Sequence, residues 1–343
     1  MKKLNIAVVG FGLIGKKHVE IINSHKNTLL CGIVDNNKNY IKDLNSEYKF
    51  FKTIKDLIAK KKPDGAIIAS PTLLHIKHAT EFVENNIPVL IEKPIASSSN
   101  EALELLELAE KKSVPILVGH HRRYNNIIKT AKSAIKDGLL GQLRSAISTS
   151  WFYKPDDYFE EAPWRKKIGA GPISVNLIHD IDVLRYLCGD ILSVQAIISP
   201  SIRNFENEDL ASIIMNFKSG MIANLSVSDS IVSPWNWETN SKENSDFPYA
   251  EQNCYFIGGT KGSLSIPDLK IWSHEKSSDW KTSIKTKRLK FNFNDPLQDQ
   301  MSHFCNVIEK NEKAYVSGSE GLKSLKVIEA IYKSGKLQKP ILI

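Results

Sequence analysis

The chain has 343 residues, a formal net charge of +8, 42% hydrophobic and 24% charged residues. This length exceeds what one ordinary hydrophobic core requires, so we expect a globular protein of two domains. No apolar run is long enough to span a membrane. The basic residues are mostly lysines spread along the chain instead of gathered in a recognisable nucleic-acid-binding module. We therefore expect neither a membrane nor a nucleic acid as partner.

Four cysteines lie far apart in the sequence, at Cys31, Cys188, Cys254 and Cys305. Without a C-x-x-C pair or a Cys/His cluster, the sequence predicts no zinc site, no other metal site and no disulfide framework. The start of the chain imitates a signal peptide but carries three spaced glycines and no small-residue cleavage site. These features favour a cytoplasmic protein with buried, reduced thiols.

The first third of the chain alternates short apolar runs with helical patterns. The expected strands are 4–9, 29–35, 65–70, 88–94 and 114–120. The expected helices are 13–25, 40–48, 53–61, 75–85 and 100–113, the last with Asn100 as its N-cap. Such alternation indicates right-handed βαβ units, and hence an α/β, doubly wound parallel sheet of the Rossmann type.

After about residue 122 the pattern changes to strands joined by turns. The expected strands are 144–153, 194–200, 211–217, 221–229, 253–259 and 262–267, with helices at 125–137, 174–188 and 319–334, the last ending at Gly335. We expect an α+β domain with an open, mainly antiparallel sheet. The expected division is 1–122 and 123–343, with the final helix as a candidate to pack back on the first domain.

A glycine-rich turn follows the first expected strand. Gly10, Gly12 and Gly15 form G-x-G-x-x-G directly before a helix. The first glycine permits the tight turn, the second the approach of a pyrophosphate, and the third close packing of helix and strand. The N–H groups of the helix start, at Leu13 and Ile14, favour phosphate binding. The turn therefore predicts a dinucleotide site.

Asp35 ends the second expected strand, twenty residues after the third glycine. A carboxylate there accepts hydrogen bonds from ribose hydroxyls and repels a 2′-phosphate. Asn36 and Asn37 add no cation, and Lys38 is too remote to reverse this preference. We expect NAD as the cofactor in preference to NADP.

The segment "IEKP" at 91–94 closes the fourth expected strand. Ligands of doubly wound sheets bind at the carboxyl ends of the strands, which places Lys93 toward the ligand. A partly desolvated lysine beside a cationic cofactor suits proton transfer. The residues alone leave a second interpretation equally open, a surface lysine paired with Glu92.

These segments together resemble the Gfo/Idh/MocA oxidoreductases, the family of glucose–fructose oxidoreductase and inositol dehydrogenase. The resemblance covers nearly the whole chain and rests on "GFGLIGKKH", "IVD", "IIASPTLLH", "IEKP", "VGHHRRYN", "APWRKK", "GAGPISVNLIHDIDVLRYL" and "VSGSEGLKSLKVIEAIYKSGK". It implies oxidation of a sugar or cyclitol secondary hydroxyl, or the reverse reduction, with NAD(P). It also implies a homodimer or homotetramer formed through the open sheet.

The resemblance also implies roles for single residues. Lys93 assists proton transfer and precedes a cis peptide to Pro94. Ser70, Pro71 and His75 match the segment along the cofactor, and Arg123 and Arg165 match arginines that contact cofactor or substrate. We also expect Glu92 along the cofactor, and Arg123, Trp164 and Arg165 to help hold the substrate. For the arginines and His75, purely structural roles stay open, such as a stacked arginine after a tryptophan.

His179 is the second candidate acid–base group. By pattern alone, a histidine on an apolar helix is most often a satisfied core residue, and Asp182 nearby is typical of a solvent-side charge paired with Arg185 or Tyr186. The resemblance implies instead that His179 is the general acid–base. The family pattern has an Asp four residues earlier, where this chain has Val175. Asn176 is a candidate to contact His179 or the substrate.

Two further features leave alternatives open. The polar, aromatic segment 233–250 reads as a lid, an insertion or a plain surface loop, in which Trp235 and Trp237 stack on a sugar or form an interface. Val175 is the best support for a non-catalytic NAD-binding regulator. Another alternative is a sugar–sugar oxidoreductase that retains its cofactor.

Overall fold

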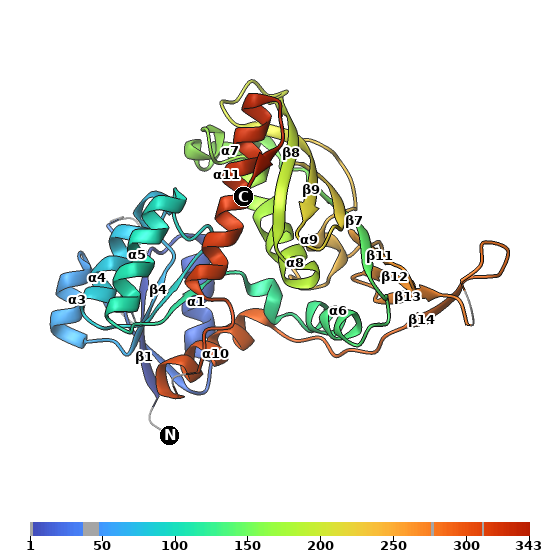
Figure 1. Ribbon diagram of the computed structural model, residues 1–343. Coiled ribbons are helices and arrows are strands. Elements are labelled where there is room, and N and C mark those ends of the chain that lie inside the picture. The colour runs from blue at the N-terminus through green and yellow to red at the C-terminus, as the bar shows by residue number, and fades with distance from the viewer. Residues whose placement is uncertain (1–2, 37–47, 276–277, 311) are drawn as a thin grey trace. The chain divides into compact units, whose positions relative to one another are not determined.

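The computed structural model describes residues 3–36, 48–275, 278–310 and 312–343. The chain divides into two compact units (Figure 1). The first unit contains Met1–His121 and Asp295–Leu325, and the second Arg122–Asn294 and Lys326–Ile343. Nearly all of the helix expected over 40–48, with Asn37 and Lys38, lies outside the described residues.

The first unit is built on a six-stranded parallel sheet of order β3-β2-β1-β4-β5-β6. Its strands are β1 (Leu4–Val9), β2 (Thr28–Val34), β3 (Phe50–Phe51), β4 (Gly65–Ile68), β5 (Val89–Ile91) and β6 (Ile116–Val118). The central strands are buried almost without alternation, as in sheets covered on both faces. The predicted doubly wound Rossmann sheet is thus confirmed.

Helices cover this sheet: α1 (Leu13–Ser24), α3 (Ile54–Lys61), α4 (His75–Glu84), α5 (Ser99–Lys111), α10 (Pro296–Lys310) and the start of α11 (Gly318–Leu337). The prediction that Asn100 caps α5 is wrong. Ser98 is the N-cap, because its side chain accepts from the Glu101 N–H while the Glu101 carboxylate accepts from the Ser98 N–H.

Helix α10 was not predicted, although the sequence contains its signals. Asp295 precedes Pro296, and the Asp295 carboxylate accepts from the N–H groups of Leu297 and Gln298. The helix places Met301 and Phe304 in the core of the first unit. It contacts α1 and so completes one face of the sheet.

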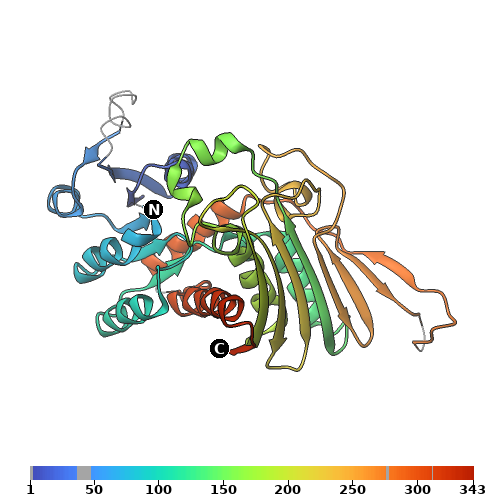
Figure 2. The same cartoon turned by 90° about the horizontal axis from the view of Figure 1, so that it is seen from above.

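The second unit is built on a nine-stranded sheet of order β14-β13-β12-β11-β7-β10-β9-β8-β15. Figure 2 shows these strands side by side. They are β7 (Leu143–Trp151), β8 (Ile191–Pro200), β9 (Glu208–Phe217), β10 (Ile222–Ser228), β11 (Tyr255–Gly259), β12 (Gly262–Ile266), β13 (Lys270–Ser273), β14 (Lys285–Arg288) and β15 (Ile341–Leu342). Among the described strands of this sheet, only β7 and β10 pair in parallel, which confirms the expected open, mainly antiparallel sheet.

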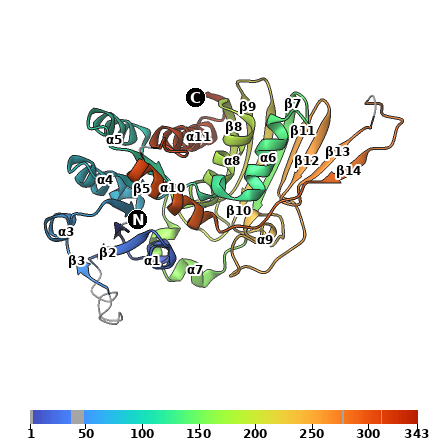
Figure 3. The same cartoon turned by 90° about the horizontal axis from the view of Figure 1, so that it is seen from below.

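Helices pack on one face of this sheet, with α6 and α8 over its middle (Figure 3). The helical segments are α6 (Asn126–Lys136), α7 (Asp156–Glu160), α8 (Ile178–Cys188), α9 (Trp237–Asn240), and the short turns η2 (His121–Tyr124), η3 (Pro163–Lys166) and η4 (Ile173–Leu177). The prediction that the final helix ends at Gly335 is wrong. Helix α11 continues to Leu337, and a Cβ at Gly335 would lie 2.5 Å from Ile198, so this glycine serves close packing.

Two expectations from composition can be compared with the structure. None of the helices in the described ranges combines the length and apolarity needed to cross a membrane. All four cysteines are free thiols. Cys31, Cys254 and Cys305 are buried, whereas Cys188 is only half-buried.

Candidate functional site

The glycine-rich turn joins β1 to α1. Gly10 adopts φ +92°, and a Cβ there would lie 2.6 Å from the carbonyl oxygen of Ala69. A Cβ on Gly15 would lie 2.1 Å from the Gly10 carbonyl oxygen, whereas one on Gly12 would meet nothing within 4 Å. The first and third glycines are therefore required by packing, and the second borders open space.

The N-terminus of α1 opens beside this space. Gly12 is the N-cap residue without a side-chain cap, and no acidic residue occupies the first turn. The N–H groups and the positive dipole end of α1 therefore suit an anion. Asp35, which follows β2, accepts a 2.7 Å hydrogen bond from the Phe11 N–H through Oδ2. The open space at Gly12 and the N-terminus of α1 fit the pyrophosphate of a dinucleotide, and the Asp35 carboxylate fits its ribose.

Glu92 is buried directly after β5 and holds the main chain at Lys93. Its Oε1 lies 2.7 Å from His18 Nε2, and its Oε2 accepts from the Lys93 N–H at 3.2 Å. Burial alone would raise the pKa of Glu92, but the His18 hydrogen bond and the charges of His18, Lys93 and His121 lower it to about 2. Lys93 itself is half-buried, and the Lys93–Pro94 peptide is cis, as the resemblance implied.

His75 begins α4 and connects the ends of two strands. Its Nε2 lies 2.8 Å from the Ser70 carbonyl oxygen and its Nδ1 lies 2.9 Å from the Pro94 carbonyl oxygen. Burial lowers the pKa of His75. His78, one turn later, contacts the Ser70 hydroxyl at 2.9 Å. The segment after β4 and the lysine-bearing segment after β5 are thus held together within the first unit.

In the second unit, a buried glutamate anchors the start of the segment that leads into α8. Glu208 Oε1 accepts from the Ile173 N–H at 3.1 Å and from the Tyr332 hydroxyl at 3.0 Å. A Cβ at Gly171 would lie 2.2 Å from the same oxygen, so only glycine fits there. Burial raises the pKa of Glu208. The anchored segment begins with η4, a π-helical turn, where a regular α-helix was expected over 174–188.

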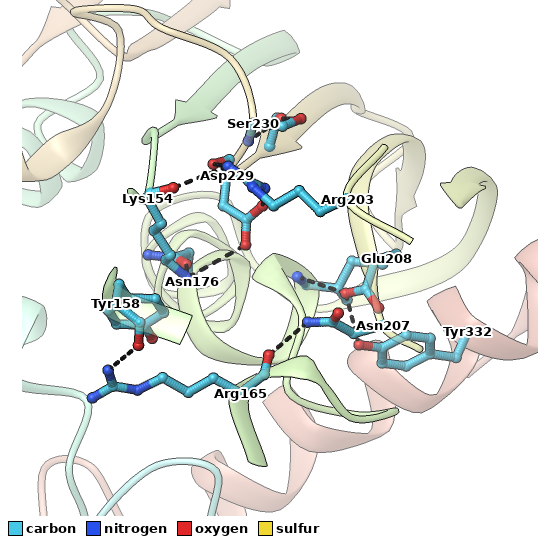
Figure 4. Close-up of polar contacts among 12 residues, drawn as sticks. Lys154, Tyr158, Arg165, Asn176, Arg203, Asn207, Glu208, Asp229, Ser230 and Tyr332 are labelled. Atoms are coloured by element: carbon cyan, nitrogen blue, oxygen red, sulfur yellow. Dashed lines mark hydrogen bonds and ion pairs between the residues drawn. The ribbon is translucent and has the colours of Figure 1, made fainter. Parts of the chain in front are cut away.

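Asn176 lies in this π-helical turn and is bound by a buried lysine. Lys154 Nζ donates to Asn176 Oδ1 at 2.8 Å and lies 3.8 Å from Asp229 Oδ2 (Figure 4). Arg203 donates to Asp229 Oδ1 at 3.1 Å. Burial raises the pKa of Asp229 although both cations oppose this. The result is a buried cluster of two cations, one carboxylate and one amide.

Arg165 lies in η3 and is buried, whereas its neighbour Trp164 is 60% exposed. The Arg165 guanidinium donates to the Tyr158 carbonyl oxygen and stacks 4.0 Å from the Tyr158 ring. Asn207 donates to the Arg165 carbonyl oxygen at 2.9 Å and fixes its backbone. Arg165 is therefore held in one orientation, as Figure 4 shows.

Arg123 makes a buried two-bond ion pair with Asp182, at 2.8 and 2.7 Å. The prediction that Asp182 is a solvent-side charge is wrong, because Asp182 is 1% exposed. Arg185, one of its two predicted partners, pairs with Asp190. Any contact of Arg123 with a substrate would have to coexist with this ion pair.

The neighbouring arginine, Arg122, is equally buried in a network of its own. It pairs with Asp180 and Glu238, and the Tyr255 hydroxyl donates to Asp180. Trp237 packs under the Arg122 guanidinium and is 1% exposed, so the idea that Trp237 stacks on a sugar is wrong. Trp235 is 42% exposed, so stacking of Trp235 on a sugar stays a prediction.

His179 lies in the first turn of α8 and is 8% exposed. Val175 and Asn176 precede it within η4, both half-buried. Because η4 is π-helical, residues 175–177, which lie two to four positions before His179, do not follow the ordinary α-helical spacing. The i−4 and i−3 positions read from the sequence therefore do not carry their usual geometric meaning here.

Two family models match the chain. One, described as an oxidoreductase family with an NAD-binding Rossmann fold, matches residues 4–120, and the GFO/IDH/MocA C-terminal domain matches residues 128–265. The chain belongs to the Gfo/Idh/MocA oxidoreductase family. The resemblance noted in the sequence is thereby confirmed.

Proteins that are similar to this chain differ in the reactions that their names state. A 2,7-anhydro-N-acetylneuraminate hydratase of Escherichia coli K12 is 26% identical over 273 residues, which cover 77% of this chain and 67% of the relative. A myo-inositol 2-dehydrogenase of Thermotoga maritima is 22% identical over 344 residues, 96% of each chain. The WlbA dehydrogenase of Bordetella pertussis, solved with NADH and UDP-GlcNAcA, shares the fold with a TM-score of 0.80 at 23% identity, covering 100% and 99% of the two chains.

Sequence reasoning missed several residues that this Gfo/Idh/MocA chain uses to hold its candidate site. His18 sits within the motif "GKKH", but nothing local indicates its bond to Glu92. Lys154, Asp229 and Glu208 lie in different strands or loops, far from η4 in sequence. Only their position next to buried segments signals a special role, since charged residues are rarely buried without a partner.

Proposed function

We propose that this protein is an NAD-dependent dehydrogenase that acts on CH–OH groups. It would transfer a hydride between the nicotinamide and a secondary hydroxyl or ketone of a sugar, cyclitol or sugar derivative. The observation that carries the proposal is the glycine-rich turn, with its open space at Gly12 and the Asp35 carboxylate fixed by the Phe11 N–H. Its membership of an oxidoreductase family supports the reaction class, and the similar myo-inositol and WlbA dehydrogenases support the substrate class.

NAD is proposed in preference to NADP. The Asp35 carboxylate at the end of the second strand would accept hydrogen bonds from the adenosine ribose hydroxyls, whereas a 2′-phosphate would meet its negative charge. Leu13, Ile14 and the three glycines would receive the pyrophosphate. Ser70, Pro71, His75 and Lys93 would follow along the cofactor, with Glu92 and Arg165 as further members of that set. When bound, NAD supplies the hydride acceptor at the nicotinamide C4.

Lys93 and His179 are proposed to manage the hydroxyl proton. When the substrate is oxidised, its C–H bond breaks with loss of a hydride, and its O–H proton passes to one of these two side chains, which leaves a ketone. Lys93 is held from its backbone side by Glu92, which fixes the origin of its side chain. Arg123, Trp164, Arg165 and Asn176 are proposed to orient the substrate.

A homodimer or homotetramer is proposed as the assembled form, in the cytoplasm. Its support is the strand face of the second unit that carries exposed apolar side chains, among them Ile147, which pairs in register with Phe256. These two residues are 50% and 47% exposed. Contiguous exposed apolar surface is typical of an interface.

The experiment that tests the proposed function is a spectrophotometric screen for NADH formation with sugars, inositols and sugar acids, repeated with NADP. We expect turnover with at least one polyol and a preference for NAD that Asp35→Ala relaxes. Lys93→Ala and His179→Ala should each lower kcat by about 10²-fold or more, as expected for loss of a general acid–base. Tight NAD binding without turnover on any substrate would instead support the non-catalytic NAD-binding regulator. NAD that stays bound through purification would support the sugar–sugar oxidoreductase.

A further inference from the structure

Lys154 follows β7 and is almost completely buried, with 6% of its surface exposed. Its ammonium group lies 2.8 Å from Asn176 Oδ1 and 3.8 Å from Asp229 Oδ2. Arg203 donates to the other oxygen of Asp229, and also to the Lys154 carbonyl oxygen at 2.9 Å. The lysine is therefore fixed at both its backbone and its charged end (Figure 4).

The partner of Lys154 determines the orientation of the Asn176 amide. An ammonium group has three donors and no acceptor, so the atom that it contacts at 2.8 Å must be the carbonyl oxygen of the asparagine. The Nδ2 group of Asn176 then points away from Lys154. It makes no hydrogen bond within the described ranges of the chain, and Asn176 is half-buried. Asn176 thus offers two N–H donors at Nδ2, while its carbonyl oxygen is turned toward Lys154.

Two cations near Asn176 share one aromatic ring. Lys154 Nζ lies 5.1 Å and the Arg165 guanidinium 4.0 Å from the centre of the Tyr158 ring. Asp229 is shared by Lys154 and Arg203 on the inside of the cluster. Glu161, which lies 3.3 Å from Arg165, and Asp156, which lies 3.8 Å from Arg203, are largely solvent-exposed. The groups that meet around Tyr158 and Asn176 are therefore mainly donors and cations.

We infer that Asn176 is a specificity-determining residue, that Lys154 positions it, and that the substrate presents a carboxylate to the Asn176 Nδ2 group. This inference rests on the proposed function. A carboxylate only accepts hydrogen bonds and makes charge-assisted ones, whereas a hydroxymethyl group at the same place would gain only neutral bonds. The substrate is thus a sugar acid rather than a neutral sugar.

The test compares matched pairs of ligands on the NAD-loaded protein. Dissociation constants of glucuronate against glucose, and of galacturonate against galactose, are measured by calorimetry, with NADH formation recorded separately. We expect at least one acid to bind about tenfold or more tightly than its neutral counterpart, the difference expected between a charge-assisted and a neutral hydrogen bond.

Two variants then separate positioning from general stability. Asn176→Asp keeps a partner for Lys154 but replaces the N–H donors by oxygens, so the preference for the acid should be lost while the fold is retained. Lys154→Met frees the amide, so KM for the acid should rise more than kcat falls. Lys218→Met, in an exposed turn, is the matched lysine control and should change neither value.

The outcomes distinguish this inference from the proposed function. Equal binding of acids and neutral sugars, or an acid preference that survives both variants, overturns the role of Asn176 and Lys154. If neutral sugars alone are oxidised, the inference fails and the proposed function stands. If acids bind with the expected preference but no NADH forms, the inference stands and the proposed function fails.

Discussion

Glu92 illustrates how a single buried residue holds the segment that carries Lys93. It lies beneath Lys93, contacts His18 at 2.7 Å, and is 7% exposed. Its carboxylate is stabilised by surrounding positive groups, although burial alone would disfavour the charge. Removing one partner from such a pair leaves a buried group unsatisfied, which costs more than an exposed pair contributes.

The depressed pKa of Glu92 predicts a pH-dependent contribution to stability. Because the folded-state pKa is about 2 and the ordinary value is 4.5, the ionised form stabilises the fold above pH 4.5, and the contribution is lost as the pH falls toward 2. Urea unfolding of the wild type and Glu92→Gln should show a difference in unfolding free energy that is largest near neutral pH and shrinks on acidification. Glu107→Gln, on the exposed face of α5, is the control. A Glu92→Gln difference that is constant or grows at low pH would contradict this account.

The residues around the glycine turn were predictable because their signal is local. Gly10, Gly12 and Gly15 follow one strand, and Asp35 ends the next, so the spacing alone indicates the site. Lys154 and Asn176 were not recognised as partners, because the contact depends on the path of the chain after β7 and on the π-helical turn. Asp182 was misjudged for a related reason: its partner, Arg123, lies 59 residues away.

At the scale of elements, hydrophobic periodicity predicted whether a segment forms a strand or a helix, whereas the ends of the helices depended on their capping residues and packing. In α5 the capping box of Ser98 and Glu101 decides where the helix begins, although Asn100 is also a common capping residue. Glycine often ends a helix, but Gly335 lies inside α11 because it packs closely against Ile198. At the end of α11, tertiary packing thus overrides the local signal of a glycine. At the start of α5, the capping box is a stronger local signal than a single asparagine.

The cap of α5 can be tested with two alanine variants. Ser98→Ala should lower the free energy of unfolding by about 1 kcal/mol, because the Glu101 N–H loses its side-chain acceptor. Asn100→Ala, inside the first turn, should change stability by less than about 0.5 kcal/mol. Thermal and urea unfolding measure both. A larger loss in Asn100→Ala than in Ser98→Ala would restore Asn100 as the cap.

At the scale of the whole molecule, the two units carry different groups of candidate site residues. The first unit contains the features that fit a dinucleotide, and the second contains Asn176, His179 and the buried Lys154 cluster. The alternation of strands and helices predicted the first architecture, and the turn-connected strands predicted the second. The return of 295–325 to the first unit was not foreseen, because α10 follows a long stretch assigned to the second sheet.

Isotope transfer tests the central claim, hydride transfer between a secondary alcohol and NAD, most directly. A polyol or sugar acid that gives turnover is labelled with deuterium at each secondary carbinol carbon, and the reduced cofactor is examined by NMR. The account predicts that one deuterium arrives at C4 of the nicotinamide with the ketone as co-product, and that His179→Ala slows this transfer. NAD that binds firmly but receives no deuterium from any labelled substrate would contradict it.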